Sequence, residues 1–573
     1  MGSVLALVIG FLILVPYGAF AQISFISPLP DGILQVHGER ADLRLRLSLP
    51  AGYESFAYKL GSDRDTCSPS EGWRSVTIDA GVVDTLLTVP KSLRGYSLYW
   101  RADLAGVDTG GIIAGLIPGH IIGIAGQSNA QGYCWEMLEQ ANGDIRMLVG
   151  DRTWQVAHEP TDGAGGGPWI VMSNMLYQMI GDTLPIGIVN VAVGGSGLTM
   201  SDIGGQWIRN DANPKDSSNY GRALRRFLNA GSELECLCWI QGESDGLDLP
   251  DPNTYRVAFA KLVHSFQADL SDTFAVFHLQ ISGNSTPQLQ MASFPEAREA
   301  LRVLPPSILV GTALGRTLDD ELHYSVLTNW AVGRMFADAI LQERFGVSTP
   351  MYPPLMPDTV ARLDSVMDGS IVGHYCFSLE WNRGRKPAML SAVRSTQYFA
   401  IHKDGAEIDP GNVWYRIDPS DSTRVLIGLI SDSISLSHDW RITYDATAAG
   451  DLAPLAFIDH TANDTVFATA FYELPVTISS ASTLGVRDFR IKQLIPNPAQ
   501  DALNCYIFAF KHESIDIELW DNRGIAVRRQ SAVLDEGMQG ITIGTEGLAS
   551  GNYWIVVRDE SGSESVQKVV LVH

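Results

Sequence analysis

Four short polar segments near the middle of the sequence carry residues that could perform chemistry. Residues 126–129 (GQSN) follow the apolar run IIGIA, and residues 193–196 (VGGS) follow IVNVA. Residues 241–243 (QGE) follow LCWI, and Asp320 stands three positions before His323. A hydroxyl, an imidazole and a carboxylate form a nucleophilic triad when they meet, because the imidazole deprotonates the hydroxyl and the carboxylate orients the imidazole. Ser128, His323 and Asp320 are side chains of these three types.

The segments between these residues alternate in character. Apolar runs typical of buried strands lie at 184–193, 234–240, 274–281 and 307–314, and apolar residues recur every three to four positions at 222–230, 254–270 and 328–345. This alternation predicts an α/β fold with a doubly wound parallel sheet and helices on both faces. Sites in such sheets lie at the carboxyl ends of the strands. We therefore expect the three segments that follow strands to converge at one edge.

These residues, in this order, resemble the SGNH (GDSL-like) hydrolases over residues 119–340, particularly the branch of sialate O-acetylesterases and acetylxylan esterases. The resemblance implies that Ser128 attacks an acyl carbonyl, that His323 acts as base and then acid, and that Asp320 orients the imidazole. His323 alone among the 12 histidines has an aspartate three positions before it. The implied substrate is an O-acetylated glycan of the sialate or xylan type, and the implied intermediate is an acyl-serine.

Ester hydrolysis also requires hydrogen-bond donors for the oxyanion. The expected set is the backbone N–H of Ser128, the backbone N–H of Gly195 and the side-chain amide of Gln241. Gly194 is an alternative to Gly195. Many SGNH enzymes have an asparagine where this chain has Gln241, so the role of Gln241 is the least direct of the three.

Supporting residues are expected around the triad. Gln127 and Asn129 flank the nucleophile, and Glu243 is interpreted as a group that orients neighbouring polar side chains. Asp319 and Glu321 compete with Asp320 for the orienting role, since a small shift of the turn would present either one to the imidazole.

A second serine requires comparison with the first. Residues 242–246 (GESDG) fit the nucleophile-elbow pattern G-x-S-x-G around Ser244. An elbow runs directly into a helix, whereas GLDLPDPN with two prolines intervenes here, so the sequence favours Ser128. No histidine pair or carboxylate cluster has metal-ligand spacing, and no dinucleotide or Walker motif is present, so we expect neither metal nor cofactor.

The remaining regions predict a multidomain, secreted chain. Residues 1–21 end in Ala-Phe-Ala and read as a signal peptide, although no Lys or Arg precedes the apolar run, and no later stretch is apolar enough to span a membrane. Residues 22–112 and 348–482 have the short alternating strands of β-sandwiches on either side of the hydrolase domain at 113–347.

The C-terminal segment 483–573 has features of its own. Residues 496–498 (PNP), an SGNY turn at 550–553 and a basic-apolar last strand resemble the sorting domain of the type IX secretion system of Bacteroidetes-like bacteria. The resemblance implies type IX export machinery as a partner, and a secreted or outer-membrane surface location. A third immunoglobulin-like spacer is the alternative.

Charge and cysteine content exclude other classes. The net charge of −23 disfavours nucleic acid and anionic membranes as partners. The six cysteines are too scattered for a disulfide scaffold or zinc ribbon; Cys236 and Cys238 are expected to be buried, and a bridge to Cys134 stays open. Two other functions stay open: a non-catalytic glycan-binding or adhesion protein, and an SGNH esterase or lipase of other acyl specificity.

Overall fold

The computed structural model describes most of the chain between residues 23 and 572. The residues outside the description are 1–22, 63–71, 94, 137, 139, 142–143, 162, 164, 182–183, 201–202, 283–293, 315, 321, 350–351, 355, 357–360, 369–370, 381–387, 390–398, 410–411, 418–423, 430–437, 445–456, 463, 468–470, 478–488, 496–498, 510–511, 522–524, 536, 560–563 and 573. The predicted signal peptide and the PNP motif therefore lie outside the described residues.

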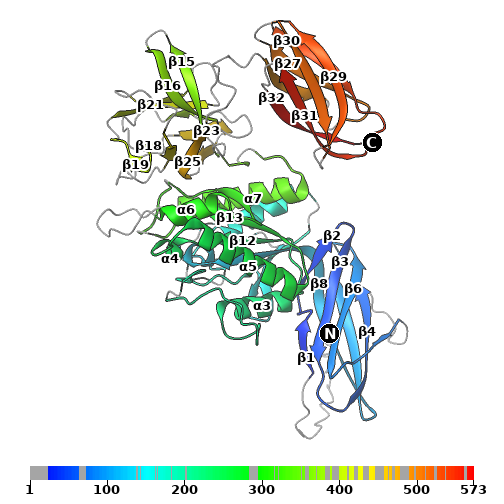
Figure 1. Ribbon diagram of the computed structural model, residues 1–573. Helices are drawn as coiled ribbons and strands as arrows, with labels where there is room; N and C mark the ends of the chain where they lie inside the picture. The colour runs from blue at the N-terminus through cyan, green and yellow to red at the C-terminus, as the bar shows by residue number, and fades with distance from the viewer. Residues whose placement is uncertain are drawn as a thin grey trace, which may run out of the picture.

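A parallel sheet forms the centre of the α/β domain (Figure 1). Its strands follow the order β10-β9-β11-β8-β12-β13-β14, and only the pair β9–β10 is antiparallel. The strands are β8 Val107–Gly126, β9 Ile145–Val149, β10 Thr153–Val156, β11 Ile186–Asn190, β12 Cys236–Ile240, β13 Ala275–Gln280 and β14 Ile308–Thr312. The neighbours of β8 in the sheet are β11 on one side and β12 on the other, so the loops after β8, β11 and β12 meet where ligands bind in doubly wound sheets.

Helices cover both faces of this sheet, as predicted. They are α1 Ser128–Gln131, α2 Trp169–Met179, α3 Asn219–Ala230, α4 Glu243–Gly246, α5 Pro252–Leu270, α6 Pro295–Arg302 and α7 Val326–Phe345. One core lies under α2 and α7, and a second lies under α3, α5 and α6. Strand β12 shows the alternation, because Cys236 and Cys238 face the first core while Leu237 and Trp239 face the second.

Local sequence signals set the ends of the long helices. Asp251 accepts hydrogen bonds from two backbone N–H groups at the start of α5, and Pro252 occupies the first turn. Ser325 caps α7 in the same way, and Gly346 ends it with a φ of 69°. These caps confirm the helices that the three-to-four spacing predicted.

The long strand β8 joins the α/β domain to the β-rich region before it. Its first half pairs antiparallel with β7, and its second half pairs in parallel with β11 and β12. The preceding strands are β1 Ser24–Ser27, β2 Ile33–His37, β3 Arg40–Ser48, β4 Tyr53–Ser62, β5 Arg74–Val76, β6 Val82–Pro90 and β7 Tyr96–Leu104. Leu43, Leu45 and Leu47 are fully buried in their common core, as the period of two predicted.

Two further β-rich regions follow the α/β domain. The first contains β15 Ala361–Asp368, β16 Ile371–Glu380, β17 Ala388–Met389, β18 Phe399–Lys403, β19 Ala406–Glu407, β20 Val413–Ile417, β21 Arg424–Leu429, β22 Trp440–Tyr444, β23 Phe457–Ala462, β24 Asp464–Phe467 and β25 Phe471–Thr477. The second contains β26 Phe489–Ile495, β27 Ala502–Ala509, β28 Glu513–Trp520, β29 Ala526–Leu534, β30 Gly537–Gly544, β31 Gly551–Asp559 and β32 Glu564–Leu571. An α/β domain accompanied by β-rich regions is thus confirmed.

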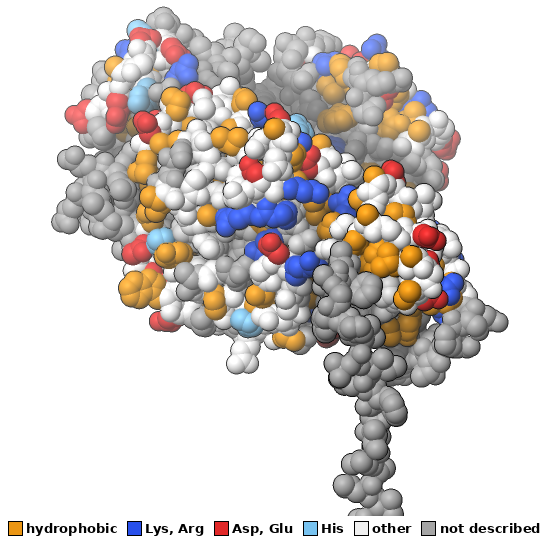
Figure 2. Space-filling model, turned by 90° about the horizontal axis from the view of Figure 1, so that it is seen from below, with side chains coloured by type: hydrophobic (Ala, Val, Ile, Leu, Met, Phe, Trp, Pro, Cys, Tyr) orange, Lys and Arg blue, Asp and Glu red, His pale blue; other side chains and the backbone are white. Residues whose placement is uncertain are grey.

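The surface carries an uneven distribution of charge. Figure 2 shows Lys and Arg side chains gathered in a band across one face, although the whole chain has a net charge of −23. Among the described residues, no helix is long and apolar enough to cross a bilayer.

Candidate active site

The turn that follows β8 is bonded to the ends of both neighbouring strands. Gln127 N donates to Ile240 O at the end of β12, and Val193 N, beyond β11, donates to Gly126 O, each at 3.0 Å. Gly126 has a φ of +132°, and a Cβ there would lie 2.0 Å from Ile240 O, so only glycine fits this position. Ser128 then begins α1 and is only 8% exposed. The predicted nucleophile therefore lies at the carboxyl edge of the sheet.

Asp320 and His323 lie in one tight turn, in which the Asp320 carboxylate is hydrogen-bonded to the His323 imidazole. Asp320 Oδ1 accepts the backbone N–H groups of Leu322 and His323, each at 2.7 Å, and Oδ2 lies 2.6 Å from His323 Nδ1. Burial alone raises the pKa of Asp320, but the hydrogen bonds from His323 and the backbone outweigh burial, so the pKa is lowered. The ionised carboxylate makes Nδ1 a donor, which leaves Nε2 free to accept a proton.

Asn129 connects the turn at Ser128 to the turn at His323. The Asn129 amide donates to Leu322 O at 3.1 Å, and its Oδ1 accepts from Tyr324 N at 3.0 Å, across a separation of 195 residues. The neighbour of Ser128 is thus bonded to both residues that flank His323. The structure brings these two predicted triad segments together at one edge.

The backbone donors predicted for the oxyanion lie beside the serine. Within the described part of the chain, neither Ser128 N nor Gly195 N has a hydrogen-bond partner. Gly194 N, in contrast, donates to Gln131 Oε1 at 2.7 Å. A Cβ on Gly194 would lie 3.8 Å from Ser128 Cβ, so the glycine pair borders the nucleophile. The geometry favours Gly195 over Gly194 as a donor.

Gln241 is fully buried, and its amide is already engaged. Its Nε2 donates to Gln127 Oε1 at 3.1 Å, to Ser196 O at 3.2 Å and to Asp245 Oδ2 at 2.6 Å. Its Oε1 accepts from Tyr255 OH at 2.6 Å. An amide NH₂ has two hydrogens, so these acceptors use its donor capacity. The contacts favour a supporting role for Gln241 over the expected role as third oxyanion donor.

Two buried side chains link the polar segments to one another. Gln127 Oε1 accepts from the backbone N–H of Ser244 at 3.1 Å and of Gly242 at 3.3 Å. Asp245, which the sequence did not single out, accepts from Leu198 N at 2.7 Å and Thr199 N at 2.6 Å. The only sequence signal for Asp245 is its position four residues after Gln241. Together these bonds fix the loops after β8, β11 and β12.

Glu243 lies beneath the site as a buried carboxyl group. It is 4% exposed, and its Oε1 accepts from the Asn129 amide at 2.7 Å. Its other oxygen, Oε2, is buried and has no hydrogen-bond partner among the described residues. Burial raises the pKa of Glu243, and the bond from Asn129 offsets this only in part. These contacts support the predicted orienting role, because Asn129 in turn holds the residues beside His323.

Asp319 and Glu321 were alternatives to Asp320, and Ser244 was an alternative to Ser128. Asp319 Oδ2 accepts from Cys134 Sγ at 3.4 Å and from Trp135 N at 3.3 Å, and so faces the loop at 134–135. Glu321 lies outside the described residues. Ser244 is 5% exposed within the single turn α4, which ends five residues before α5 instead of leading directly into a long helix.

The three cysteines of the α/β domain are free and buried. Cys236 and Cys238 lie on β12 and are fully buried, as expected. Cys134 forms no bridge to either of them and contacts Asp319 instead.

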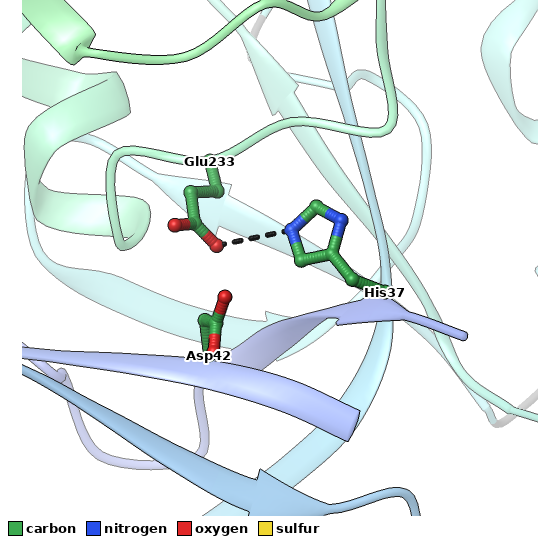
Figure 3. A group of neighbouring side chains, drawn as sticks. All are labelled: His37, Asp42 and Glu233. Atoms are coloured by element: carbon green, nitrogen blue, oxygen red, sulfur yellow. Dashed lines mark hydrogen bonds and ion pairs between the residues drawn. The ribbon is translucent and has the colours of Figure 1, made fainter. Parts of the chain in front are cut away.

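A separate group of potential metal ligands lies at the opposite edge of the sheet. His37, Asp42 and Glu233 each offer one ligand atom, and these atoms lie within 4.8 Å of one another (Figure 3). His37 Nε2 is 3.2 Å from Glu233 Oε2. Glu233 precedes the amino end of β12, whereas Ser128 follows the carboxyl end of β8, so this group has no contact with the serine site. Spacing along the chain could not reveal it, because 196 residues separate His37 from Glu233.

The fold is that of a doubly wound α/β domain, in which ligands bind at this edge of the sheet. Residues 118–342 match the family model described as carbohydrate esterase, sialic acid-specific acetylesterase, and residues 493–572 match the secretion system C-terminal sorting domain. The chain therefore carries a carbohydrate esterase domain of this family and a sorting domain, which confirms both resemblances. The sorting domain indicates a secreted or cell-surface protein.

Individual relatives agree with this assignment. A probable carbohydrate esterase from Arabidopsis thaliana is 28% identical over 181 residues, which cover 27% of this chain and 65% of that protein. The chain thus spans slightly less than two thirds of this relative. The solved structure of a carbohydrate acetylesterase from Xanthomonas citri has a TM-score of 0.56 at 17% identity, covering 78% of this chain and 98% of that one. At this identity the second likeness concerns the fold alone.

Proposed function

We propose that this protein is a secreted carbohydrate esterase that removes O-acetyl groups from glycans through an acyl-serine intermediate. The family of residues 118–342 supports the class of reaction, and the sorting domain supports secretion through type IX export machinery. The observation that supports the mechanism is the pair of hydrogen bonds between Asn129 and the residues on either side of His323: Asn129 donates to Leu322 O and accepts from Tyr324 N.

In the first half of the reaction, Ser128 Oγ bonds to the acetyl carbon while His323 Nε2 takes the hydroxyl proton. The carbonyl oxygen becomes an oxyanion, which accepts from the backbone N–H groups of Ser128 and Gly195. The ester C–O bond then breaks, and His323 gives the proton to the sugar oxygen, which leaves as a hydroxyl group. In the second half, water replaces the sugar, acetate departs and the serine hydroxyl is restored.

Acetate release from purified protein tests this proposal. The substrates are acetylated xylan, O-acetylated sialic acid and p-nitrophenyl acetate. We expect Ser128→Ala to lower kcat by at least about 10³-fold, and Asp320→Asn to lower it by about 10²–10⁴-fold, because the imidazole then loses its orienting charge. Asp319→Asn and Ser244→Ala are the matched controls, and each should retain kcat within about 3-fold. The Asp319 side chain faces the loop at 134–135, and Ser244 bonds Gln127 through its backbone N–H, which alanine keeps.

Full activity of Ser128→Ala together with loss in Ser244→Ala would overturn the mechanism. A series of longer acyl esters separates acetyl specificity from that of a lipase, since faster hydrolysis of the longer chains contradicts an O-acetylesterase. A protein that binds acetylated glycan equally well with and without Ser128, but releases no acetate, would be a binding module.

A further inference from the structure

The segment that follows the nucleophile helix exposes two aromatic rings. Tyr133 is 42% exposed and Trp135 is 80% exposed, whereas Cys134 between them is 2% exposed. Cys134 exchanges two backbone hydrogen bonds with Gly166, each at 3.0 Å. Cys134 therefore faces inward at this bridge, while the rings on either side of it are exposed to solvent.

This aromatic segment is attached directly to the turn that carries the imidazole. The ring of Tyr133 stacks on the ring of His323, with centroids 4.5 Å apart and an interplanar angle of 20°. Trp135 N donates to Asp319 Oδ2 at 3.3 Å, and Asp319 N donates to His323 O at 2.8 Å. The backbone of Trp135 is therefore tied to the turn that carries His323.

A third apolar side chain lies at the mouth of the site. Ile203 is 96% exposed, and its Cγ1 lies 2.5 Å from the position that a Cβ on Gly195 would take. Ile203 thus lies against Gly195, whose N–H is the proposed oxyanion donor. Single exposed apolar side chains are common on proteins, but a group of them around one reactive serine marks a binding surface.

We propose that Trp135, with Tyr133 behind it, forms a sugar-binding subsite that stacks against the apolar face of an uncharged pyranose ring. This inference rests on the proposed function. One face of a pyranose presents C–H groups that pack on an aromatic ring, while its hydroxyl groups remain in water at the rim, and an indole supplies a large rigid apolar surface for this contact. The stack holds the glycan while its acetyl ester reaches Ser128.

The charges around the segment favour an uncharged sugar over an anionic one. Among the described residues of the segment 134–138, Trp135 N donates to the carboxylate of Asp319 and Leu138 N to that of Glu159. Asp320 adds a further negative charge beside His323. An acidic sugar would be repelled by these groups at close range, so we assign the subsite to neutral glycan chains.

The test compares a glycan ester with an ester that is too small to reach the subsite. Trp135→Ala should lower kcat/KM on acetylated xylo-oligosaccharide by about 10-fold or more through KM, while hydrolysis of p-nitrophenyl acetate stays within about 2-fold. Trp135→Phe should restore part of the loss. Val257→Ala, at an apolar side chain of α5 that is 61% exposed, is the control and should leave both activities unchanged.

Two outcomes would overturn the subsite: equal loss on both esters, or no loss on either. A larger loss on O-acetylated sialic acid than on the xylo-oligosaccharide would contradict the uncharged substrate. Binding of acetylated xylo-oligosaccharide to Ser128→Ala, with and without Trp135→Ala, separates this inference from the proposed function. Undiminished acetate release by Ser128→Ala ends the proposed mechanism, whereas tight binding without Trp135 ends the subsite.

Discussion

At the level of single residues, the candidate site depends on buried polar groups that hold the reactive ones in place. Glu243 is the clearest case, because its carboxyl group is buried, its Oε1 accepts from Asn129, and its Oε2 has no hydrogen-bond partner among the described residues. A carboxylate in such surroundings is costly to ionise. This group therefore supports the site at the expense of stability.

Glu243→Gln tests whether Glu243 supports the site through its hydrogen bond to Asn129 or through its charge. The amide oxygen of Gln still accepts from Asn129, so we expect kcat to remain within about 5-fold of wild type, whereas Glu243→Ala, which removes the acceptor, should lose about 10-fold or more. Acetate release from p-nitrophenyl acetate measures both variants. If Gln is as inactive as Ala, the charge of Glu243 takes part in the reaction.

The same variant has a pH-dependent effect on stability. The folded-state pKa of Glu243 is raised by burial, so below the unfolded pKa of about 4.3 both states hold the proton and the group has no effect. As the pH rises above that value the unfolded state releases its proton first, which lowers the free energy of unfolding. Urea denaturation should therefore show Glu243→Gln more stable than wild type at pH 8, with the difference vanishing toward pH 4.

How much of the site the sequence could predict depends on how local each contact is. Asp320 and His323 lie within one turn, so their spacing predicted a carboxylate–imidazole pair that the structure bears out. The environment of Gln241 was not predictable, because Tyr255 and Asp245, which occupy its amide, reach it only after the chain has folded. Whether Gly194 or Gly195 keeps a free N–H likewise depends on where the Gln131 side chain points.

At the level of elements, strand and helix periodicity predicted the parallel sheet but not where one unit ends. The expected boundary between residues 112 and 113 falls inside β8, which is a single strand from Val107 to Gly126. Apolar residues continue through this stretch because each half is buried by a different partner. The one-turn helices α1 and α4 are too short to show periodicity.

A buried ionic network holds four of these elements together at the amino ends of the strands. Glu235, before β12, accepts from Gln35 of β2 at 2.9 Å and from Arg344 of α7 at 2.8 Å, and lies 3.1 Å from His120 Nδ1 of β8. Burial raises the pKa of Glu235, but the bonds from His120 and Arg344 outweigh burial and lower it. The carboxylate is therefore ionised and satisfied.

Removal of this carboxylate should loosen the junction between β2, β8 and α7. We expect Glu235→Ala to lower the free energy of unfolding at pH 7 by about 3 kcal/mol, because buried partners are left without an acceptor. Glu235→Gln keeps an acceptor oxygen and should lose less. Urea denaturation measures both variants, and a loss in Ala no larger than in Gln would show that the network does not stabilise the fold.

At the level of the whole molecule, one hydrophobic core extends over two regions of the chain, whereas another belongs to the last region alone. One continuous cluster includes residues of α2 and α7 together with Phe399, Ile442 and Tyr444 of the following β-rich region. The last β-rich region has its own cluster, whose buried members all lie between residues 491 and 571. The first β-rich region after the α/β domain therefore shares its core with the enzyme domain, and the sorting domain does not.

Two truncations distinguish these relationships. A chain ending at residue 482 removes only the separate C-terminal core, so kcat/KM on p-nitrophenyl acetate should stay within about 2-fold, and Tm of the remaining part should change by less than about 3 °C. A chain ending at residue 347 removes the apolar partners of α7, and it should unfold at lower temperature and aggregate, because the exposed face of the cluster is apolar. Calorimetry and the same esterase assay measure both chains. Equal stability of the two would contradict the shared core, and loss of activity in the longer chain would mean that the sorting domain contributes to the site as well as to export.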